Sequence, residues 1–257
     1  MPRDDTLSDR QRRILAAVQR QGYATIEALA DVLGVSAQTA RREVIRLDKA
    51  RLLQRFHGGA ASRAEDRVRP GYALKRRLSA DAKGRIGLAA AKLVPAGGTV
   101  LLDVGTTVEA AARALAERPR LRVVTNSLNA AAALSGRDGV EVFVPGGSLR
   151  GADGSLVGET ACAGIGRFRC DVALIGCSGF APDGAPMDYD LDKVAVKQAM
   201  LAASRRAVLL ADSAKFGREA LVRIAPAAAF GHVVTEAPPP AWLAAMLETA
   251  GTMTVLA

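Results

Sequence analysis

Residues 34–60, GVSAQTARREVIRLDKARLLQRFHGGA, carry the densest set of local signals in this 257-residue chain. Ser36 is a suitable helix N-cap, and the register that starts there places Ala40, Val44 and Leu47 on one face. Polar and basic side chains occupy the other faces. The segment therefore predicts a helix with an apolar back and a basic front.

Two further helices are expected upstream of this one. Gly34 permits the tight turn in which a preceding helix crosses the basic helix, so the pair forms a helix-turn-helix pattern. Residues 8–22 contain another helix, which packs behind the other two. The apolar positions that define the two upstream helices are Ile26, Leu29, Ala30 and Leu33 in the nearer one and Ile14, Leu15 and Val18 in the other.

A β-hairpin is expected downstream. Two short apolar runs flank Gly58-Gly59, a two-residue turn suited to a hairpin. A hairpin at this position makes the motif a winged helix-turn-helix, with Arg55 and His57 on the wing.

The basic face has two explanations. A run of charges is usually an ordinary solvated face, and the helix pair alone leaves that explanation open. The N-cap, the basic front and the hairpin in succession favour DNA binding, because a helix that enters a major groove needs donors in its first two turns. The expected DNA-binding residues are Ser36, Gln38, Thr39, Arg41, Arg42, Arg55 and His57, and Arg12 and Arg13 are further candidates for phosphate contacts.

Composition narrows the partner and the compartment. A net charge of +9 favours a polyanion, and an aromatic content of 4% favours duplex DNA over single strands, which bind by stacking. Cys162, Cys170 and Cys177 lack CxxC spacing and predict reduced thiols rather than disulfides or a metal site. Neither a secretory signal nor an apolar run of membrane-spanning length is present, so a cytoplasmic protein without membrane contact is expected.

The pattern divides the chain into a winged helix-turn-helix domain over residues 1–62, a linker over 63–73 and a larger domain over 74–257. Residues 61–71 lose all periodicity and mix both charge signs with a proline, which places the boundary near Pro70. A helix is expected over residues 74–93.

The larger domain alternates short apolar runs with alanine-rich helical stretches. This alternation predicts an α/β fold, with parallel strands and helices on both faces of the sheet. The expected strands are residues 99–104, 121–126, 140–145, 171–176, 206–211 and 232–237.

Polar or glycine-rich turns follow five of these strands. The first strand closes on DVGTT, residues 103–107, where backbone N–H groups and threonine hydroxyls at a helix start attract an anion. Any single turn is explained as well by the needs of a β-to-α connection, but five of them favour one site beyond the carboxyl ends of the strands. The other turns are 125–127, Gly146-Gly147, 176–179 and Asp212-Ser213, and Lys197 and Lys215 are candidates to balance a phosphate, with solvated lysines as the alternative.

The motifs together resemble the DeoR family of bacterial transcriptional regulators over nearly the whole chain. The segments that carry the resemblance are VSAQTARREVIRLDKARLLQRFHGGA and then, in order, DVGTT, VTNSLN, PGGSLR, IGCSG, VKQAM and ADSAKFG. The resemblance implies an effector domain similar in fold to ribose-5-phosphate isomerase and the CoA-transferase-like proteins. Family members of this type bind phosphorylated sugars or related intermediates as inducers.

The resemblance also implies the residues of the effector site. PMDYDLDKVAVKQAML and VVTEAPPPAWL are most similar to members whose effector is glycerol 3-phosphate, and no cofactor is expected beyond such an effector. The sequence departs from the family pattern at Ala214, where serine is usual, at Lys193 and Ser148, where acids are common, and at Glu43, where aspartate is more usual. The family pattern assigns the phosphate to Gly105, Thr106 and Thr107, and the rest of the site to Asp103, Asn126, Gly147, Arg150, Ser178, Lys197, Asp212 and Lys215.

The implied function is repression of carbohydrate or glycerol metabolism genes. A symmetric homodimer or homotetramer places two recognition helices in successive major grooves of an operator, and the phosphorylated effector favours an arrangement with the wrong spacing. The alternative is a sugar-phosphate isomerase-like enzyme with a basic N-terminal extension, in which Asp103, Asp212 and Lys215 supply base and acid. Such an enzyme has no use for the winged motif, so a regulator without turnover is expected. An architectural DNA-binding protein without a ligand leaves the polar strand ends unexplained.

Overall fold

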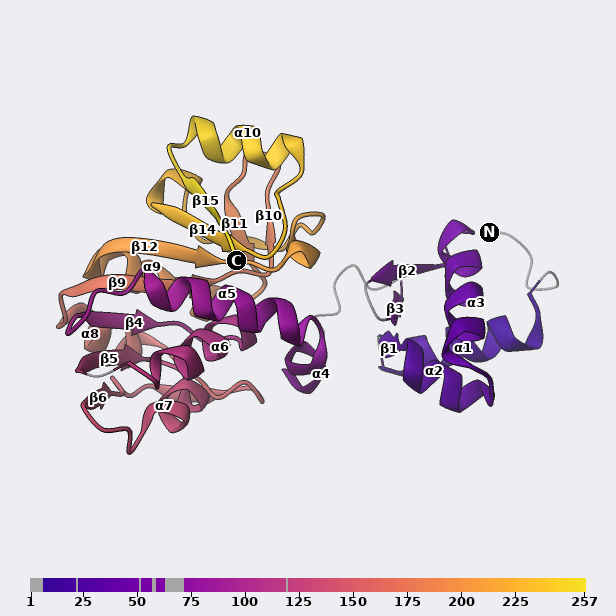
Figure 1. Cartoon of the computed structure of the whole chain (residues 1–257), viewed down its shortest axis with the longest axis horizontal. Helices are drawn as coiled ribbons and strands as arrows, with labels where there is room; N and C mark the ends of the chain where they lie inside the picture. The colour runs from indigo at the N-terminus through magenta and orange to yellow at the C-terminus, as the bar shows by residue number, and fades with distance from the viewer. Residues whose placement is uncertain (1–6, 22, 51, 57–58, 63–71, 119) are drawn as a thin grey trace. The chain divides into compact units, whose positions relative to one another are not determined.

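The structure, a computed structural model, describes residues 7–21, 23–50, 52–56, 59–62, 72–118 and 120–257. These residues form two compact units, Met1–Leu74 and Lys75–Ala257 (Figure 1). Most of the predicted linker, residues 63–71, lies outside the described residues. Its last two residues begin helix α4 (Tyr72–Arg77), so regular structure starts two residues earlier than predicted.

The N-terminal unit contains the predicted helix-turn-helix. Gly34 ends the first helix of the pair with a left-handed φ of 66°, and the Ser36 hydroxyl accepts a hydrogen bond from the Thr39 amide to start the second. Val44 and Leu47 are buried against Leu29 and the helix behind, as their spacing predicts. The three helices are α1 (Asp9–Gln21), α2 (Ile26–Leu33) and α3 (Ala37–Lys49).

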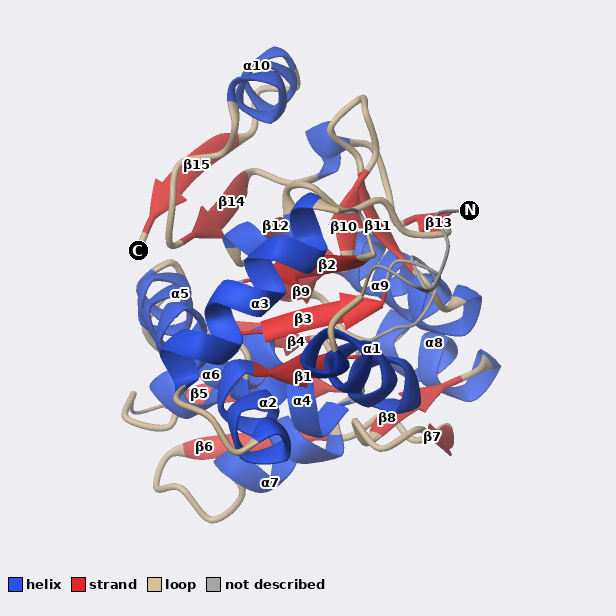
Figure 2. Ribbon diagram, turned by 90° about the vertical axis from the view of Figure 1, so that its right-hand side faces the viewer, coloured by secondary structure: helices blue, strands red, loops and turns tan. Residues whose placement is uncertain are grey.

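A three-stranded antiparallel sheet completes this unit (Figure 2). The predicted hairpin is present, but Gly59 is the first residue of a strand and pairs with Phe56, so Gly58-Gly59 is not the turn. His57 and Gly58 lie outside the described residues. An unpredicted strand of three residues pairs with the second strand of the hairpin, and it is too short to show an alternating pattern. The strands, in the order β1-β3-β2, are β1 (Tyr23–Thr25), β2 (Leu53–Phe56) and β3 (Gly59–Ser62).

The C-terminal unit is built on a seven-stranded parallel sheet. All six predicted strands are in it, which confirms the α/β fold. The seventh lies at an edge and exposes most of its side chains, so its sequence carries no burial pattern. In sheet order the strands are β15 (Met253–Leu256), β14 (His232–Thr235), β12 (Ser204–Leu210), β9 (Cys170–Gly176), β4 (Thr99–Leu102), β5 (Leu121–Thr125) and β6 (Val140–Phe143).

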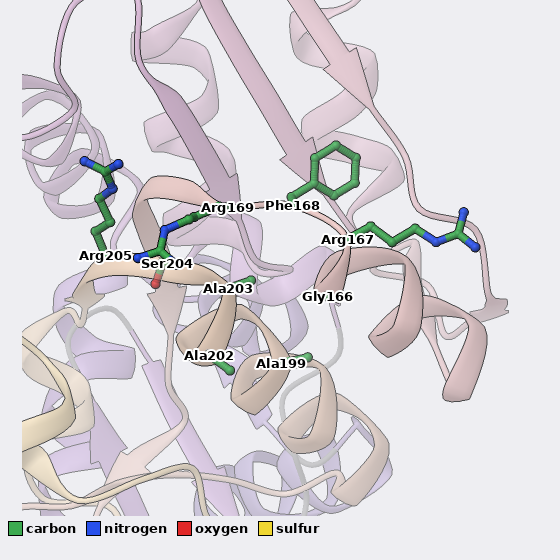
Figure 3. A pocket seen from close by; sticks show the side chains of 9 residues that line it. All are labelled: Gly166, Arg167, Phe168, Arg169, Ala199, Ala202, Ala203, Ser204 and Arg205. Atoms are coloured by element: carbon green, nitrogen blue, oxygen red, sulfur yellow. The ribbon is translucent and has the colours of Figure 1, made fainter.

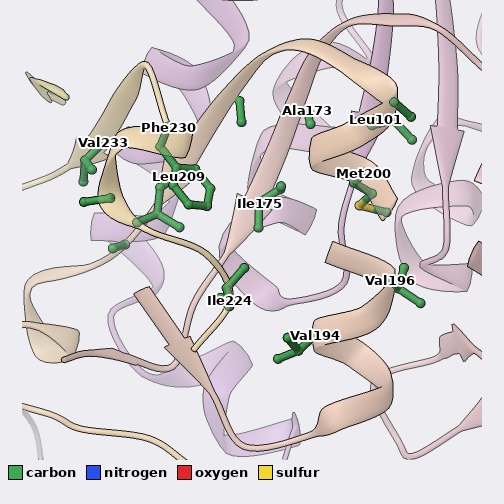
Figure 4. Close-up of a cluster of buried hydrophobic side chains, with 14 of the residues drawn as sticks. Leu101, Ala173, Ile175, Val194, Val196, Met200, Leu209, Ile224, Phe230 and Val233 are labelled. Atoms are coloured by element: carbon green, nitrogen blue, oxygen red, sulfur yellow. The ribbon is translucent and has the colours of Figure 1, made fainter. Parts of the chain in front are cut away.

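Helices cover both faces of this sheet and enclose two apolar cores. Side chains alternate along a strand, so Leu101 of β4 enters one core while Val100 and Leu102 enter the other. Figure 4 shows the first of these cores, in which strand residues such as Leu101 meet Met200 of a covering helix. That core lies under α8 (Glu159–Gly166), α9 (Leu191–Ala203) and α10 (Ala241–Thr249), and the other under α5 (Ala80–Lys92), α6 (Thr106–Leu115) and α7 (Leu128–Leu134).

The predicted helix over residues 74–93 is two helices. α4 and α5 are separated at Ser79, whose left-handed φ of 52° cannot continue a helix. We call Leu78 and Ser79 the α4–α5 elbow. The remaining short elements are a hairpin of β7 (Ser148–Arg150) and β8 (Ser155–Val157), a small sheet of β10 (Gly179–Phe180), β11 (Pro186–Asp188) and β13 (Val222–Arg223), and the 3₁₀ turns η3 (Ser213–Lys215) and η4 (Ala227–Ala229).

The close packing of α5 on α6 depends on Gly87. A Cβ atom at that position would lie 2.6 Å from the main-chain carbon of Ala110, whereas a Cβ at Gly84 of the same helix would meet nothing within 4 Å. Gly87→Ala should therefore lower the free energy of unfolding by about 1–3 kcal/mol through overpacking. Gly84→Ala should be neutral or stabilise by up to about 1 kcal/mol.

Urea unfolding followed by tryptophan fluorescence measures this pair of variants, because Trp242, the one tryptophan of the chain, lies in α10 of the C-terminal unit. Equal stability of the two variants would contradict the packing argument.

Candidate functional site

The outward face of α3 carries the predicted basic side chains. Gln38, Arg41 and Arg42 are exposed, and Arg55 is exposed on β2 of the wing. The guanidinium of Arg46 on the same helix is paired with Glu43 at 2.8 Å, which leaves it less suited to a phosphate. His57 lies outside the described residues.

Three further polar contacts are made by side chains of α1. Glu43, which stands where aspartate is more usual, is buried and accepts a hydrogen bond from the side-chain amide of Gln11 on α1 at 3.1 Å. The longer side chain of glutamate therefore has a role in packing α3 against α1. Arg12 donates to the carbonyl of Leu7 at 2.9 Å, and Arg13 to that of Val32. Both arginines, which the sequence predicts as candidates for phosphate contacts, donate to main-chain carbonyls in this structure.

A buried ionic cluster forms where β4, β9 and β11 end. Lys197 of α9 is 1% exposed and its Nζ contacts Asp103 Oδ2, Asp188 Oδ2 at 3.4 Å and the Gly176 carbonyl at 3.0 Å. The Gly176 amide donates to the same oxygen of Asp103 at 3.1 Å, and the Ser178 hydroxyl donates to Asp188 at 2.9 Å. We call these five residues the Lys197 cluster.

The charges of this cluster set one another's ionisation. Burial works to lower the pKa of Lys197, but the attraction of Asp103 and Asp188 outweighs it and raises the pKa, so the ammonium keeps its proton. Burial raises the pKa of Asp103, against the opposing pull of Lys197. Because two carboxylates surround one ammonium, the cluster has no net positive charge with which to bind a phosphate.

Two buried oxygen atoms at this end of the sheet receive no hydrogen bond from the described residues. They are Asp103 Oδ1, after β4, and Asn126 Oδ1, after the neighbouring strand β5. The amide nitrogen of Asn126 donates to the Leu156 carbonyl at 3.1 Å, which fixes its orientation. Buried acceptors are normally satisfied, so both oxygens suit the hydroxyl donors of a bound polyol.

The start of α6 is open to an anion. Gly105, with a φ of 132°, precedes the helix, and no side chain caps this N-terminus. The first amides of a helix have no partner within it and carry its positive dipole end. Thr106 and Thr107 are the first two residues of α6, so this turn offers main-chain N–H groups and hydroxyls as donors to a phosphate.

The turn after β12 is arranged differently. The carboxylate of Glu236 accepts hydrogen bonds from the Ser213 amide at 3.0 and 3.1 Å and from its hydroxyl at 2.6 Å, so this turn already holds an internal anion. Lys215 Nζ lies 4.0 Å from Asp212 Oδ2. Burial raises the pKa of the Cys177 thiol to about 12. The charges of Lys215 and Asp212 act on this thiol, as do those of Lys197 and Asp188. The turn after β12 and the Lys197 cluster therefore converge around Cys177.

Two of the predicted effector residues have other contacts in this structure. A Cβ at Gly147 would lie 2.8 Å from the Val157 carbonyl oxygen, so close approach of β8 explains the glycine. Arg150 is exposed and pairs with Asp192 and, at 3.8 Å, with Asp190 at the start of α9. The remaining predicted residues lie at the carboxyl ends of the strands or on α9.

Four buried charged residues near this site were not assigned to it from the sequence: Asp188, Lys83, Glu109 and Lys193. Lys193 lies one turn before Lys197 and pairs with Asp153 of the β7–β8 hairpin. Lys83 was detectable, because it precedes the apolar residues Ile86 and Ala90 by three and seven positions and so shares the buried face of α5.

One described cavity lies away from this site. It has a volume of about 620 Å³ and lies at the amino ends of β9 and β12, where α8 and α9 end, with alanines of α9 and arginines on both sides (Figure 3). The C-terminus of a helix favours a nearby cation, and the arginines around this cavity follow the ends of α8 and α9. Their position at these helix ends explains them. A second cavity, of about 420 Å³, adjoins the loop that follows Lys215 and is lined by Phe180, Pro182, Phe216, Gly217, Arg218, Glu219 and Trp242.

Comparison with known families decides the identity of both units. Residues 78–237 match the DeoR C terminal sensor domain, and residues 10–66 match the DeoR-like helix-turn-helix domain. The chain belongs to the DeoR family. It is therefore a transcriptional regulator, and the winged motif is the DNA-binding part of this DeoR protein.

Relatives of this DeoR protein are named as repressors. It is 37% identical to the glycerol-3-phosphate regulon repressor of Escherichia coli, over 91% of this chain and 92% of the relative. It is 40% identical to the Haemophilus influenzae repressor of the same name, over 84% of each. The E. coli transcriptional repressor CsqR is 35% identical over 95% of this chain and 93% of its own. These relatives favour a repressor over the enzyme alternative.

Solved structures are more distant. Ribose 5-phosphate isomerase A of Methanocaldococcus jannaschii matches 53% of this chain and 54% of its own, with 16% identity and a TM-score of 0.37. The Pyrococcus horikoshii initiation factor eIF-2B matches 82% and 68%, with 15% identity and a TM-score of 0.43. Neither likeness bears on the chemistry of the site. Within the described residues, no helix has the length and apolar character needed to cross a membrane.

Proposed function

We propose that this DeoR-family repressor is released from its operator by a phosphorylated polyol, with glycerol 3-phosphate as the first candidate. The main support is chemical: an uncapped helix start at Thr106 suits a phosphate, while the unsatisfied oxygens of Asp103 and Asn126 suit hydroxyl groups. Relatives at 37% and 40% identity are named for a glycerol-3-phosphate regulon. Glycerol 3-phosphate carries both chemical groups.

The proposed mechanism is a coupling between two binding equilibria. A homodimer or homotetramer holds two α3 helices at the spacing of successive major grooves, and the effector favours an arrangement that does not fit the operator. Effector and operator must then weaken each other's binding by the same factor, typically about 5- to 150-fold.

The test uses the full chain and an operator duplex selected in vitro from random DNA. Fluorescence anisotropy measures operator affinity with glycerol 3-phosphate, glycerol or inorganic phosphate, and thermal unfolding measures ligand binding directly. Glycerol 3-phosphate at a hundredfold excess over its Kd should stabilise the protein by about 2.7 kcal/mol. It should also release the operator, whereas glycerol should do neither. A panel of sugar phosphates that leaves operator affinity unchanged would overturn the proposal.

Lys215 is expected to serve the effector rather than the DNA, because it belongs to the C-terminal unit and lies beside Asp212 at the strand ends. Lys215→Ala should leave operator affinity within about twofold of the wild-type value. Loss of a charge-assisted hydrogen bond should weaken glycerol 3-phosphate binding by about 10- to 100-fold. The same anisotropy titration measures both quantities, and a folded variant that no longer binds the operator would contradict the assignment.

A further inference from the structure

The two edges of the seven-stranded sheet differ in how they are protected. β6, at one edge, carries the exposed carboxylate of Glu141, which pairs with Arg122 of the neighbouring strand at 3.7 Å. A charged side chain on an edge strand disfavours the addition of a further strand. β15, at the other edge, has the sequence MTVL, with no charge and no proline, and more than half of the Met253 and Leu256 side chains is exposed. β15 is therefore an unprotected edge.

The outer side of β15 presents main-chain hydrogen-bonding groups. The amides of Met253 and Ala257 donate inward, at 3.1 and 2.9 Å, to main-chain carbonyls at the two ends of the β14 segment. Because successive amides of a strand point to opposite sides, those of Thr254 and Leu256 point outward. Within the part of the chain that the structure describes, no strand lies on that side of β15. The edge can therefore accept one more strand.

We infer that β15 pairs with β15 of a second copy of this chain, antiparallel across a two-fold axis, so that the two sheets join into one. When this pairing is centred on Val255, Thr254 of each copy lies opposite Leu256 of the other, and each such pair exchanges two main-chain hydrogen bonds. Every outward amide of β15 then has a carbonyl partner. The inference goes beyond the proposed function, which needs a dimer but does not depend on which surface forms it.

The helices beside β15 enlarge this interface. Specific dimers bury about 1,200–2,000 Å² in total, which four residues of strand cannot supply. α5 and α10 both pack on β15, one on each face of the sheet, and Val255 belongs to the core under α5. Arg85 of α5 donates to the Ala257 carbonyl at 2.7 Å, and the C-terminus lies beside α5 in both views of the chain (Figures 1 and 2). The joined sheet therefore brings these helices close to their copies.

The exposed face of α5 is suited to a copy of itself. Asp81, Arg85 and Leu88 are exposed and follow one another at intervals of four and three residues, so they share one face of the helix. The two-fold axis makes the two α5 helices antiparallel, which places the acidic start of one beside the later, basic and apolar part of the other. A chain with a net charge of +9 repels its copy, so an uncharged strand flanked by self-complementary charges favours this edge as the contact.

The first test removes one outward amide from the full chain. Thr254→Pro lacks that donor but leaves the inward hydrogen bonds of β15, and proline is tolerated on an edge strand where the amide faces outward. Each dimer loses two hydrogen bonds, so its dissociation constant in analytical ultracentrifugation should rise by about 30- to 1,000-fold. Thr254→Val is the matched control, because it keeps the amide and nearly the same shape. Its dissociation constant should stay within about fivefold of the wild-type value.

The second test changes a side chain of the edge. Leu256→Lys adds an ammonium to each copy on the same face of the joined sheet and removes apolar contact. It should therefore weaken the dimer by about 10- to 100-fold. Leu149→Lys is the matched control, since Leu149 is a similarly exposed leucine, at 61% against 58%, on a strand outside the seven-stranded sheet. This control should associate like the wild type.

Hydrogen exchange tests the pairing in the wild-type protein without a substitution. The outward amides of Thr254 and Leu256 should exchange as slowly as the inward amide of Val255 at concentrations where the chain is dimeric. On a free edge they would exchange rapidly, because only water would occupy the outer side of β15. Rapid exchange in the dimer would contradict the inference.

The outcomes separate this inference from the proposed function. A dimer that Thr254→Pro and Thr254→Val weaken equally overturns the inference and leaves the proposed function standing, because another surface then joins the subunits. A monomeric wild type overturns both the interface and the dimeric mechanism. If Thr254→Pro loses the circular dichroism of the folded protein, the lysine variants decide: a weaker dimer for Leu256→Lys alone supports the inference, and equal association of the two overturns it.

Discussion

Lys197→Met should lower the free energy of unfolding of the C-terminal unit by about 3–5 kcal/mol, because it removes one partner of a buried ion pair. Asp103 and Asp188 both contact the Lys197 ammonium and are 0% and 5% exposed. Without it, the interior contains two carboxylates with no cation between them. The hydrocarbon part of methionine fills most of the vacated space. The loss of stability therefore measures the effect of removing the positive charge rather than that of creating a cavity.

Urea unfolding monitored at Trp242 measures this effect. The exposed residue Lys92 provides the matched control, since Lys92→Met should change stability by no more than about 0.5 kcal/mol. The double variant Asp103→Asn/Lys197→Met should recover part of the lost free energy of unfolding, because it removes one of the two buried carboxylates that Lys197→Met leaves without a cation. Additive single-variant effects would show that the two groups do not interact and would refute the ion-pair account.

Replacing both Arg41 and Arg42 by alanine should weaken operator binding by about 2–6 kcal/mol if both read guanines, at about 1–3 kcal/mol for each bidentate contact. Both side chains are exposed on the first two turns of α3, where a recognition helix meets base edges. Arg46→Ala should have a smaller effect, because Glu43 already neutralises that guanidinium.

A salt titration distinguishes base contacts from phosphate contacts. Each lost phosphate contact reduces the slope of log affinity against log salt by about 0.9, whereas loss of a base contact changes specificity and leaves the slope unaltered. Anisotropy with operator and scrambled duplexes provides both numbers. If the double variant and Arg46→Ala bind the operator equally well, α3 is not the recognition helix.

Sequence reasoning identified most of the fold because its signals are local. Ser36 marks a helix start because its hydroxyl can cap the first amides, and Gly34 marks a helix end because glycine readily adopts a left-handed φ. The apolar runs of the six strands are long enough to indicate burial. The elements that it missed lack such signals. β1 has three residues, β15 is an exposed edge strand, and Ser79 breaks a helical pattern without a glycine or proline.

The candidate site was anticipated less completely. The strand-end rule predicted Asp103 and Asn126 as site residues, and Lys197 was a candidate to balance a phosphate before the family resemblance assigned it to the same site. Their arrangement was not predictable, because Asp103 and Lys197 are 94 residues apart in sequence. Asp188 reaches the cluster through β11, a strand of three residues outside the main sheet, and no periodicity places it there.

The sequence by itself determined the two-part organisation, the winged helix-turn-helix, the parallel sheet and the end of that sheet where the polar turns gather, because caps and periodicities are properties of short segments. Only the tertiary structure decided which oxygens stay unsatisfied, which lysines already have carboxylate partners, and that the buried ammonium of Lys83 donates to the main-chain carbonyls of Lys75 and Leu78. Those outcomes depend on which distant side chains share a buried volume, where one hydrogen bond or one opposite charge decides whether a polar group is satisfied or available.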